Sequence, residues 1–179
     1  EAAGHTGGMY GHGGDFLYRW GNPNAYGAPG PQQLFGQHSP YWVDGDPKRI
    51  MINNDGFGRP PITTFCGTCN LTTANMLNDI PVDKGNYFRA PGTAFGPATD
   101  TTPINFKAPS ALWSNFEGSS QLLGNGNLLI SSAIRDSLYE VDMADTQIVW
   151  RMYVPNGAFR CHEYRKTFVD SFFQKPLKN

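Results

Sequence analysis

Four strand-length runs of apolar residues follow one another between positions 118 and 153. They read SSQLL, NLLISSA, SLYEVD and QIVWRMY, and the turn segments Gly124–Gly126, Arg135-Asp136 and Met143–Thr146 separate them. Short runs rich in Leu, Ile, Val and aromatic residues, bounded by turn residues, are typical of antiparallel hairpins. Their combined length is that of one four-stranded β-propeller blade. We therefore expect a four-stranded antiparallel sheet in this region.

A sequence pattern that occurs twice in the chain predicts a second unit of the same kind. DFLYRWG at 15–21 resembles QIVWRMY at 147–153, so both are expected to form the outer, fourth strand of a blade. Between them, HSPYWV (38–43) and RIMINND (49–55) would be inner strands, and ITTF (62–65) and INFKAP (104–109) later strands. The Pro-, Gly- and Asn-rich stretch 66–101 would be a long excursion between the later strands, with a weak helical turn near Thr72–Leu77. FRCHEY (159–164) would begin a further blade.

This pattern predicts an all-β protein with about two and a half four-stranded β-propeller blades. Residues 1–179 would be the C-terminal part of one propeller domain, with an irregular insertion at about 61–114. Two and a half blades cannot close a ring, and an open wedge exposes sheet edges. We expect missing N-terminal blades or another chain to complete the ring. A small self-sufficient β-sandwich is the alternative.

Composition narrows the class of protein. The chain has 179 residues, a formal net charge of −1 and 16% charged residues, without Lys/Arg clusters, which argues against a nucleic-acid surface. No apolar run approaches the roughly 20 residues that a membrane-spanning helix needs. The 21 Gly and 14 Pro suit many tight turns, while four Trp and twelve Phe supply a core and argue against disorder.

Two cysteines lie next to a possible glycosylation site. Cys66 and Cys69 form CGTC, and the sequon Asn70-Leu71-Thr72 follows directly. A local disulfide, a free pair and a redox or metal role are all compatible with this spacing. We favour the disulfide, because the chain shows neither the βαβ unit of a redox motif nor a second pair of metal ligands. A disulfide beside a glycosylated Asn70 would indicate an extracytoplasmic location.

Several motifs together resemble the arylsulfotransferase (arylsulfate sulfotransferase) family. They are EAAGHTGG, GGDFLYRWGNPNAYG, QLFGQHSPYWV and RIMINNDGFGRP, followed later by NGNLLISSAIRDSLYEVDMADTQIVWRMY and FRCHEYRK. The resemblance is dense over 1–60, good over 116–165 and loose over 61–114. It implies a six-bladed propeller outside the cytoplasm, either periplasmic or secreted. It also implies transfer of a sulfuryl group from an aryl sulfate to a phenolic acceptor, without a nucleotide sulfate donor and without a cofactor.

The resemblance also implies a reaction centre at the Gln-His motif. His38 occupies the position of the histidine that becomes transiently sulfated in the family, and a neutral imidazole is an available nucleophile near neutral pH. Sulfuryl transfer develops charge on the equatorial and leaving oxygens, which needs cationic and amide donors. The candidate groups are Arg19, Asn53 and Asn54 for these oxygens, and Trp20, Tyr26, Tyr41 and Trp42 for an aryl pocket. We expect no metal site at His5 and His12, because no rigid element fixes them.

Plainer interpretations stay open for each of these residues. His38 can be an ordinary polar residue at the start of a strand, and Arg19 a structural partner, since Arg151 occupies the equivalent repeat position. The stretch 53–56 also has the form of a turn, and the aromatic residues can simply be core. The protein would then be a propeller that has lost catalysis and serves as an extracellular binding or structural module. A glycan-binding or lyase-like propeller would need a carboxylate cluster from Asp44, Asp46 and Asp55.

Overall fold

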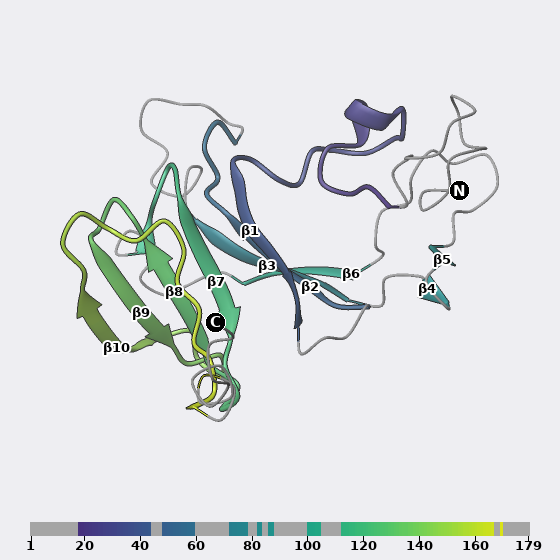
Figure 1. Ribbon diagram of the computed structural model, residues 1–179. Coiled ribbons are helices and arrows are strands. Elements are labelled where there is room, and N and C mark those ends of the chain that lie inside the picture. The colour runs from purple at the N-terminus through teal and green to yellow at the C-terminus, as the bar shows by residue number, and fades with distance from the viewer. Residues whose placement is uncertain are drawn as a thin grey trace, which may run out of the picture.

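A computed structural model describes residues 18–43, 48–59, 72–78, 82–83, 86–87, 100–104, 112–166 and 169. Its main feature is a pair of four-stranded antiparallel sheets (Figure 1). The first sheet has the order β1 (Gln37–Trp42), β2 (Ile50–Asn54), β3 (Thr73–Asn78), β6 (Asp100–Ile104). The second has the order β10 (Ile148–Tyr153), β9 (Ser137–Val141), β8 (Leu128–Ser132), β7 (Gly118–Leu122). The prediction of an all-β protein is confirmed.

The smaller elements lie outside these two sheets. A two-stranded hairpin joins β4 (Val82–Asp83) to β5 (Asn86–Tyr87), and a 3-10 helix, η1, spans Pro23–Tyr26. Figure 1 shows η1 and the segment around it on the side of the first sheet that is away from the second sheet. This position lets the segment cover a face of the first sheet.

The second sheet follows the sequence pattern closely. Its strands pair in chain order, β7 with β8, β8 with β9 and β9 with β10, so each turn joins neighbouring strands. Between β7 and β8 the chain reverses at Gly126, which has a φ of 90°, a conformation that favours glycine. The side chain of Asn125 accepts a hydrogen bond from the backbone N–H of Asn127 at 3.0 Å. The predicted four-stranded sheet is thus confirmed, with boundaries shifted by a residue or two.

The first sheet takes its later strands from other residues than those predicted. β1 and β2 form where HSPYWV and RIMINND were expected, but the third strand is β3, at the position of the expected helical turn. That expectation was wrong, because Ala74 and Leu77 are buried on opposite faces of a strand paired with β2. ITTF lies outside the described residues. The fourth strand, β6, overlaps INFKAP at Ile104 alone.

Two further predicted strands do not form within the described residues. Positions 18–21, the described part of DFLYRWG, have no strand pairing, and neither does FRCHEY at 159–164. FRCHEY instead lies along β7, held by one backbone bond, from the N–H of Gly118 to the carbonyl of Phe159 at 3.0 Å, and otherwise by side-chain bonds. Ser119 Oγ donates to the carbonyl of Cys161 at 3.1 Å, and Gln121 Nε2 donates to the carbonyl of Glu163 at 3.0 Å. Polar side chains of an edge strand thereby replace the ladder that a further strand would have made.

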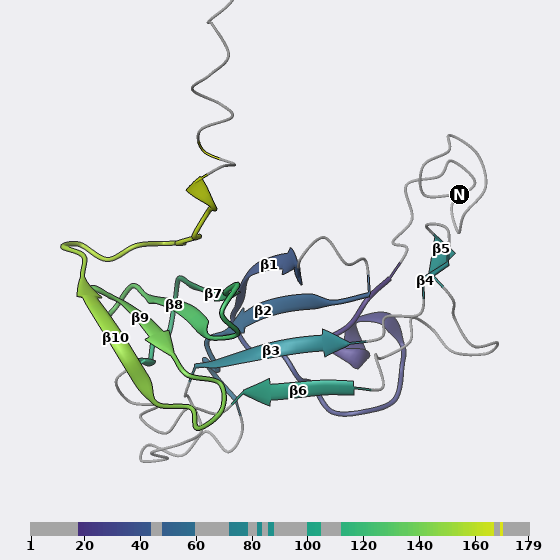
Figure 2. The same cartoon turned by 90° about the horizontal axis from the view of Figure 1, so that it is seen from below.

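The two sheets share one hydrophobic core. Met51 and Ala74 of the first sheet pack with Leu128, Ile130 and Val141 of the second. Figure 2, seen from below, shows β1 and β2 close to β7, and the two sheets spread apart towards β6 and β10. We call the side of the first sheet that carries His38, Met51 and Asn53 the junction face.

The opposite side of the first sheet has a core of its own. Ile52, Leu77 and Leu34 are buried there, and Tyr18 and Trp20 pack against them. We call this side, which also carries Gln37 and Asn54, the outer face. Because successive residues of a regular strand point to opposite sides, each face receives every second residue of β2. In β1 the register of the pairing with β2 shifts between His38 and Tyr41, so the alternation is interrupted there.

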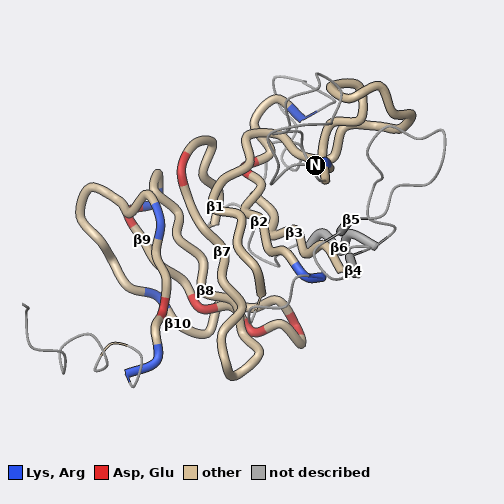
Figure 3. Tube along the Cα trace, turned by 45° about the vertical axis from the view of Figure 1, so that its right-hand side comes forward, with Lys and Arg blue, Asp and Glu red and all other residues tan. Residues whose placement is uncertain are grey.

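Figure 3 shows basic and acidic positions interspersed along the described chain rather than gathered on one face. Among the described residues there is no helix long and apolar enough to cross a bilayer.

Candidate functional site

His38 lies beside a β-bulge in an edge strand. The pairing of β1 with β2 places His38 opposite Asn53, but Tyr41 opposite Met51, so the register shifts between His38 and Tyr41. Ser39 in the bulge has a φ of 49°, and Pro40, which has no N–H to donate, is tolerated because β1 is at the edge of its sheet. Bulges bend a strand and redirect its side chains, and they are frequent beside active sites.

The imidazole of His38 meets a buried carboxyl group on the junction face. Its Nε2 lies 3.0 Å from Oδ2 of Asp55, whose side chain is 0% exposed, whereas that of His38 is 30% exposed. The backbone N–H of Glu117, from the chain leading into β7, points at the same Nε2 with a separation of 3.3 Å. One ring nitrogen is therefore engaged from both sheets. Within the described part of the chain, Nδ1 has no hydrogen-bond partner.

Asp55 is held by an amide network that crosses the junction. Asn53 Nδ2 donates to Asp55 Oδ1 at 2.8 Å, and Ser120 Oγ of β7 donates to Asn53 Oδ1 at 2.8 Å. Oδ2 accepts no hydrogen bond among the described residues, so its polar contact there is the one with His38. Burial raises the pKa of Asp55 from its ordinary value to about 8, against the lowering effect of the Asn53 hydrogen bond.

Residues with positive φ surround this contact. Besides Ser39, Glu117 has a φ of 58° and Gly118 a φ of 143°. Ser39 Oγ donates to the carbonyl of Gly118 at 3.0 Å, which links the bulge of β1 to β7. Non-glycine residues at positive φ cost energy, and such positions cluster at functional sites. Two of them, Ser39 and Glu117, therefore mark the junction around His38 as a place where the fold holds a specific geometry.

The structure brings two of the predicted site residues to the side of His38. Asn53 orients Asp55 as described, with both atoms of its amide already hydrogen-bonded. Tyr41 accepts a hydrogen bond from the N–H of Leu122 through its hydroxyl, and its ring meets His162 edge-to-face with centroids 5.5 Å apart. The ring of Phe159 also packs edge-on to His38, with centroids 6.1 Å apart.

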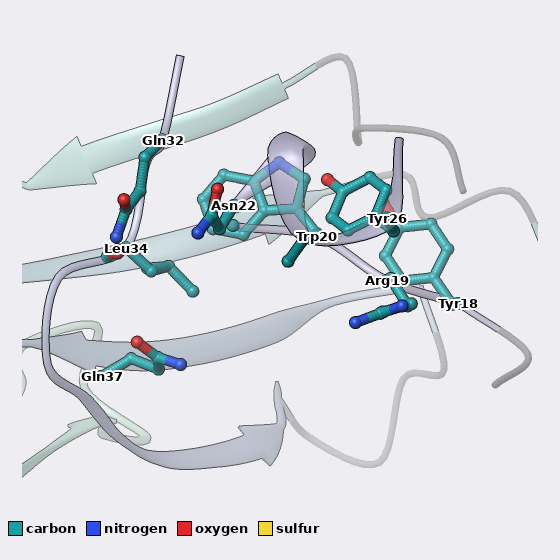
Figure 4. Close-up of a pocket in the computed structure, with 10 residues that line it drawn as sticks. Tyr18, Arg19, Trp20, Asn22, Tyr26, Gln32, Leu34 and Gln37 are labelled. Carbon is teal, nitrogen blue, oxygen red and sulfur yellow. Dashed lines mark hydrogen bonds between the residues drawn. The ribbon is translucent and has the colours of Figure 1, made fainter. Parts of the chain in front are cut away.

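The other predicted residues lie on the outer face. Asn54 donates to Asn75 Oδ1 at 3.2 Å and to the carbonyl of Gln33 at 3.1 Å, so it joins the buried amide network of that face. Trp42 is 43% exposed. Arg19 and Trp20 line a pocket together with Tyr26, and Figure 4 shows their side chains around it. The structure therefore places these residues across the sheet from His38.

Some of the predicted positions are not covered by the structure. Cys66, Cys69 and Asn70 lie outside the described residues, as do His5, His12, Asp44 and Asp46. Among the residues that are described, no group of three His, Cys, Asp or Glu side chains is arranged to hold a metal ion.

Sequence reasoning missed the most direct partners of His38. Asp55 was assigned to a turn, and the backbone amide of Glu117, about eighty positions further along the chain, has no sequence signal at all. The alternation of β2 did carry one clue, because residues 53 and 55 must share a face if the strand is regular. His38, opposite Asn53, then falls on that same face.

The arrangement is that of a histidine oriented by a buried carboxyl group, at a partly open junction of two sheets. A search of protein-family models, of curated proteins and of solved structures finds no match to this chain.

Proposed function

We propose that the protein transfers a sulfuryl group from an aryl sulfate to a phenolic acceptor, with His38 as the covalent nucleophile. The observation that carries the proposal is the contact of His38 Nε2 with the buried Oδ2 of Asp55 at 3.0 Å. A nucleophile oriented by a second group, which a third group holds in turn, is the common arrangement for covalent catalysis. Here Asn53 is that third group.

The two sheets would be neighbouring blades of a β-propeller, in which β1 and β7 are the innermost strands. The sharing of one core and the spreading of the sheets away from β1 and β7 support this arrangement. The remaining blades of a six-bladed ring would come from outside these two sheets or from another chain. They would also supply cationic groups for the sulfuryl oxygens, because Arg19 lies on the outer face.

The reaction would use the Nδ1 lone pair of His38. When Asp55 is ionised and Nε2 carries the ring proton, Nε2 donates to Asp55 and no longer accepts from the Glu117 N–H. Nδ1 then holds the lone pair and is free to attack sulfur. The nitrogen–sulfur bond forms, the bond from sulfur to the aryl oxygen breaks, and the phenolate leaves with the electron pair. The cationic sulfated imidazole is stabilised by the Asp55 carboxylate. Attack of an acceptor phenolate on sulfur then breaks the nitrogen–sulfur bond and restores His38.

The protonation state of the pair would control the rate. Below the pKa of Asp55, about 8, the carboxyl group keeps its proton and can donate it to Nε2, and the hydrogen of the neutral ring then lies on Nδ1. Raising the pH through this value removes that proton and exposes the lone pair. We therefore expect turnover of an aryl sulfate to rise with pH around 8.

The test compares three variants in one assay of aryl-sulfate turnover with a phenolic acceptor. His38→Ala should lower turnover about a thousandfold, as expected for loss of a covalent nucleophile. Asp55→Asn should also lower it and remove the rise near pH 8. The matched control is His162→Gln, another histidine of the same junction, which should keep the activity. An acid-labile mass increase of one sulfuryl group on the peptide with His38 would identify the intermediate.

A non-catalytic module is the second candidate, and one observation favours it. The Glu117 N–H and the Ser39 hydroxyl tie β1 to β7 at this very position, so His38 can serve to hold two sheets together. Absence of turnover with several aryl sulfates, together with a lower unfolding free energy of His38→Ala, would overturn the enzymatic proposal and favour the module. The extracytoplasmic location is part of both proposals. It is tested by mass analysis of the peptide with Cys66, Cys69 and Asn70.

A further inference from the structure

The outer face of the first sheet carries a pocket that the chemistry of His38 does not use. Its volume is about 410 Å³, and Tyr18, Arg19, Trp20, Asn22, Tyr26 and Gln37 line most of it. Figure 4 shows the Arg19 and Gln37 side chains reaching into the space from opposite sides, with the rings of Trp20, Tyr26 and Tyr18 along another wall. Pockets of roughly 300–1,000 Å³ are typical for small-molecule ligands.

Specific backbone and core contacts hold the segment that forms the pocket. Gly21, with a φ of 116°, approaches Leu34 so closely that an added Cβ would lie 2.8 Å from Leu34 Cδ1. The carbonyl of Gly21 accepts hydrogen bonds from the N–H groups of Gln33 and Leu34, which closes the loop that contains η1. Gly27 ends η1 in the left-handed conformation. Because Leu34 and Trp20 belong to the hydrophobic cluster of the outer face, the lining is anchored in the core.

The chemistry of the lining selects an aromatic anion. Among the described residues that line it, Arg19 is the one with a formal charge, and this charge is positive. Its guanidinium lies over the ring of Tyr26, with Cζ 5.3 Å from the centroid. Burial raises the pKa of Tyr26, and the charge of Arg19 works against this, so Tyr26 is a neutral phenol at physiological pH. Aromatic walls accept planar rings, and a guanidinium is well suited to a planar carboxylate or sulfate.

We propose that this pocket binds a small aromatic anion, namely a single ring that carries a carboxylate or sulfate group. The ring would lie against Trp20 and Tyr26, and the anionic group would meet Arg19 and the amide of Gln37. The inference goes beyond the proposed function, because Gln37 and His38 point to opposite faces of β1 and the bound ring would not touch the imidazole. The pocket is a separate binding site within the same sheet.

The experiment is a calorimetric titration of the full chain with 4-hydroxybenzoate. The matched ligand is 4-hydroxybenzamide, which has the same ring and nearly the same shape but no charge. Arg19→Met should weaken binding of the anion about tenfold, as expected for loss of a partly exposed charge-assisted contact. The matched control is Arg135→Met, because Arg135 also lies over an aromatic ring, that of Trp113, at 5.6 Å. It should leave the affinity unchanged.

Each outcome decides the matter. Selective binding of the anion, lost with Arg19→Met and kept with Arg135→Met, supports the proposal. Equal affinity for the acid and the amide overturns it, as does the absence of heat at millimolar ligand or an unchanged affinity of Arg19→Met. His38→Ala separates this proposal from the enzymatic one. That variant should lose turnover and still bind 4-hydroxybenzoate with the affinity of the original chain.

Discussion

The two faces of the first sheet use neighbouring residues of the same strands for different purposes. On the junction face, His38, Asn53 and Asp55 form a polar network that continues into the second sheet through Ser120. On the outer face, Gln37 borders an open pocket, although it is next to His38 in the chain. The difference teaches that a motif such as GQH does not define one site. It supplies residues to two sites, on either side of a strand.

The two faces also differ in how firmly the fold holds their polar groups. The amide, carboxyl and hydroxyl groups of Asn53, Asp55 and Ser120 in the junction network are buried and lie between positive-φ residues, so small changes there should be costly. The pocket on the outer face is lined by partly or fully exposed polar side chains, so changes there should alter binding rather than stability. Three substitution experiments test this contrast, from the largest expected effect to the smallest.

Gly118→Ala should disrupt the junction most. An added Cβ at Gly118 would lie 2.8 Å from the carbonyl oxygen of Ser131 and 3.0 Å from Nδ2 of Asn53, and the φ of 143° is unfavourable for alanine. Strain and overpacking together should lower the free energy of unfolding by about 4 kcal/mol. Urea denaturation measures this directly. Gly124→Ala is the matched control, because a Cβ there meets no atom within 4 Å, and a similar loss in that variant would contradict the role given to Gly118.

The pH dependence of stability should report on Asp55. Its pKa is about 8 in the folded protein and near 3.8 when unfolded, so the folded state binds more protons between these values. The contribution of Asp55 to the free energy of unfolding is therefore fully present below about pH 4, decreases as the pH rises, and is lost as the pH passes through 8. Each pKa unit corresponds to about 1.4 kcal/mol, and screening through the partly open site reduces the total to about 3 kcal/mol.

Thermal or urea denaturation across this range, with Asp55→Asn for comparison, gives the measurement. The free energy of unfolding of Asp55→Asn should change less with pH than that of the original chain, and the difference is the contribution of the carboxyl group. The same series on His38→Gln separates the effect of the imidazole from that of the carboxyl group. A slope that persists in Asp55→Asn would show that another group causes it.

The smallest effects come from a pair of substitutions on opposite faces. Asn53→Ala removes the donor to Asp55 and the acceptor of Ser120, so it should cost about 2 kcal/mol. Gln37→Ala, one residue from His38 but exposed on the outer face, should change stability by less than about 0.5 kcal/mol. Urea denaturation of the two variants side by side measures this difference. Equal decreases in the free energy of unfolding would mean that polar residues on the two faces contribute equally to stability.

The second sheet was predictable because its information is local. Each strand of 118–153 is followed by a turn with its own signal, and each strand pairs with the next in the chain. The first sheet combines such local pairing with pairing across long intervals. β3 escaped prediction because Asn75, a polar residue, is buried in the amide network with Asn54, which hides the alternation of apolar positions.

The candidate site divides in the same way. The sequence identified His38, Asn53 and the aromatic residues as chemically suitable for a site. It did not show which of them lie together, because that depends on the bulge at Ser39 and on the face to which each strand residue points. The structure separates Arg19, Trp20 and Asn54 from His38 and joins His38 to Asp55, which had the form of a turn residue. The sulfotransferase activity that the resemblance implies stays a prediction, and the turnover experiment tests it.

The sequence by itself determined the all-β class, the four hairpin strands of 118–153 and the position of His38 at the start of a strand. These features depend on neighbouring residues, whose side-chain alternation and turn preferences act over a few positions. Tertiary structure alone decided which face each residue occupies and which distant groups meet it. The N–H of Glu117 reaches His38 because burial of Met51, Ala74 and Ile130 in one core holds the two sheets together. Packing energy of that kind is summed over many residues far apart in the chain, and so no short motif encodes it.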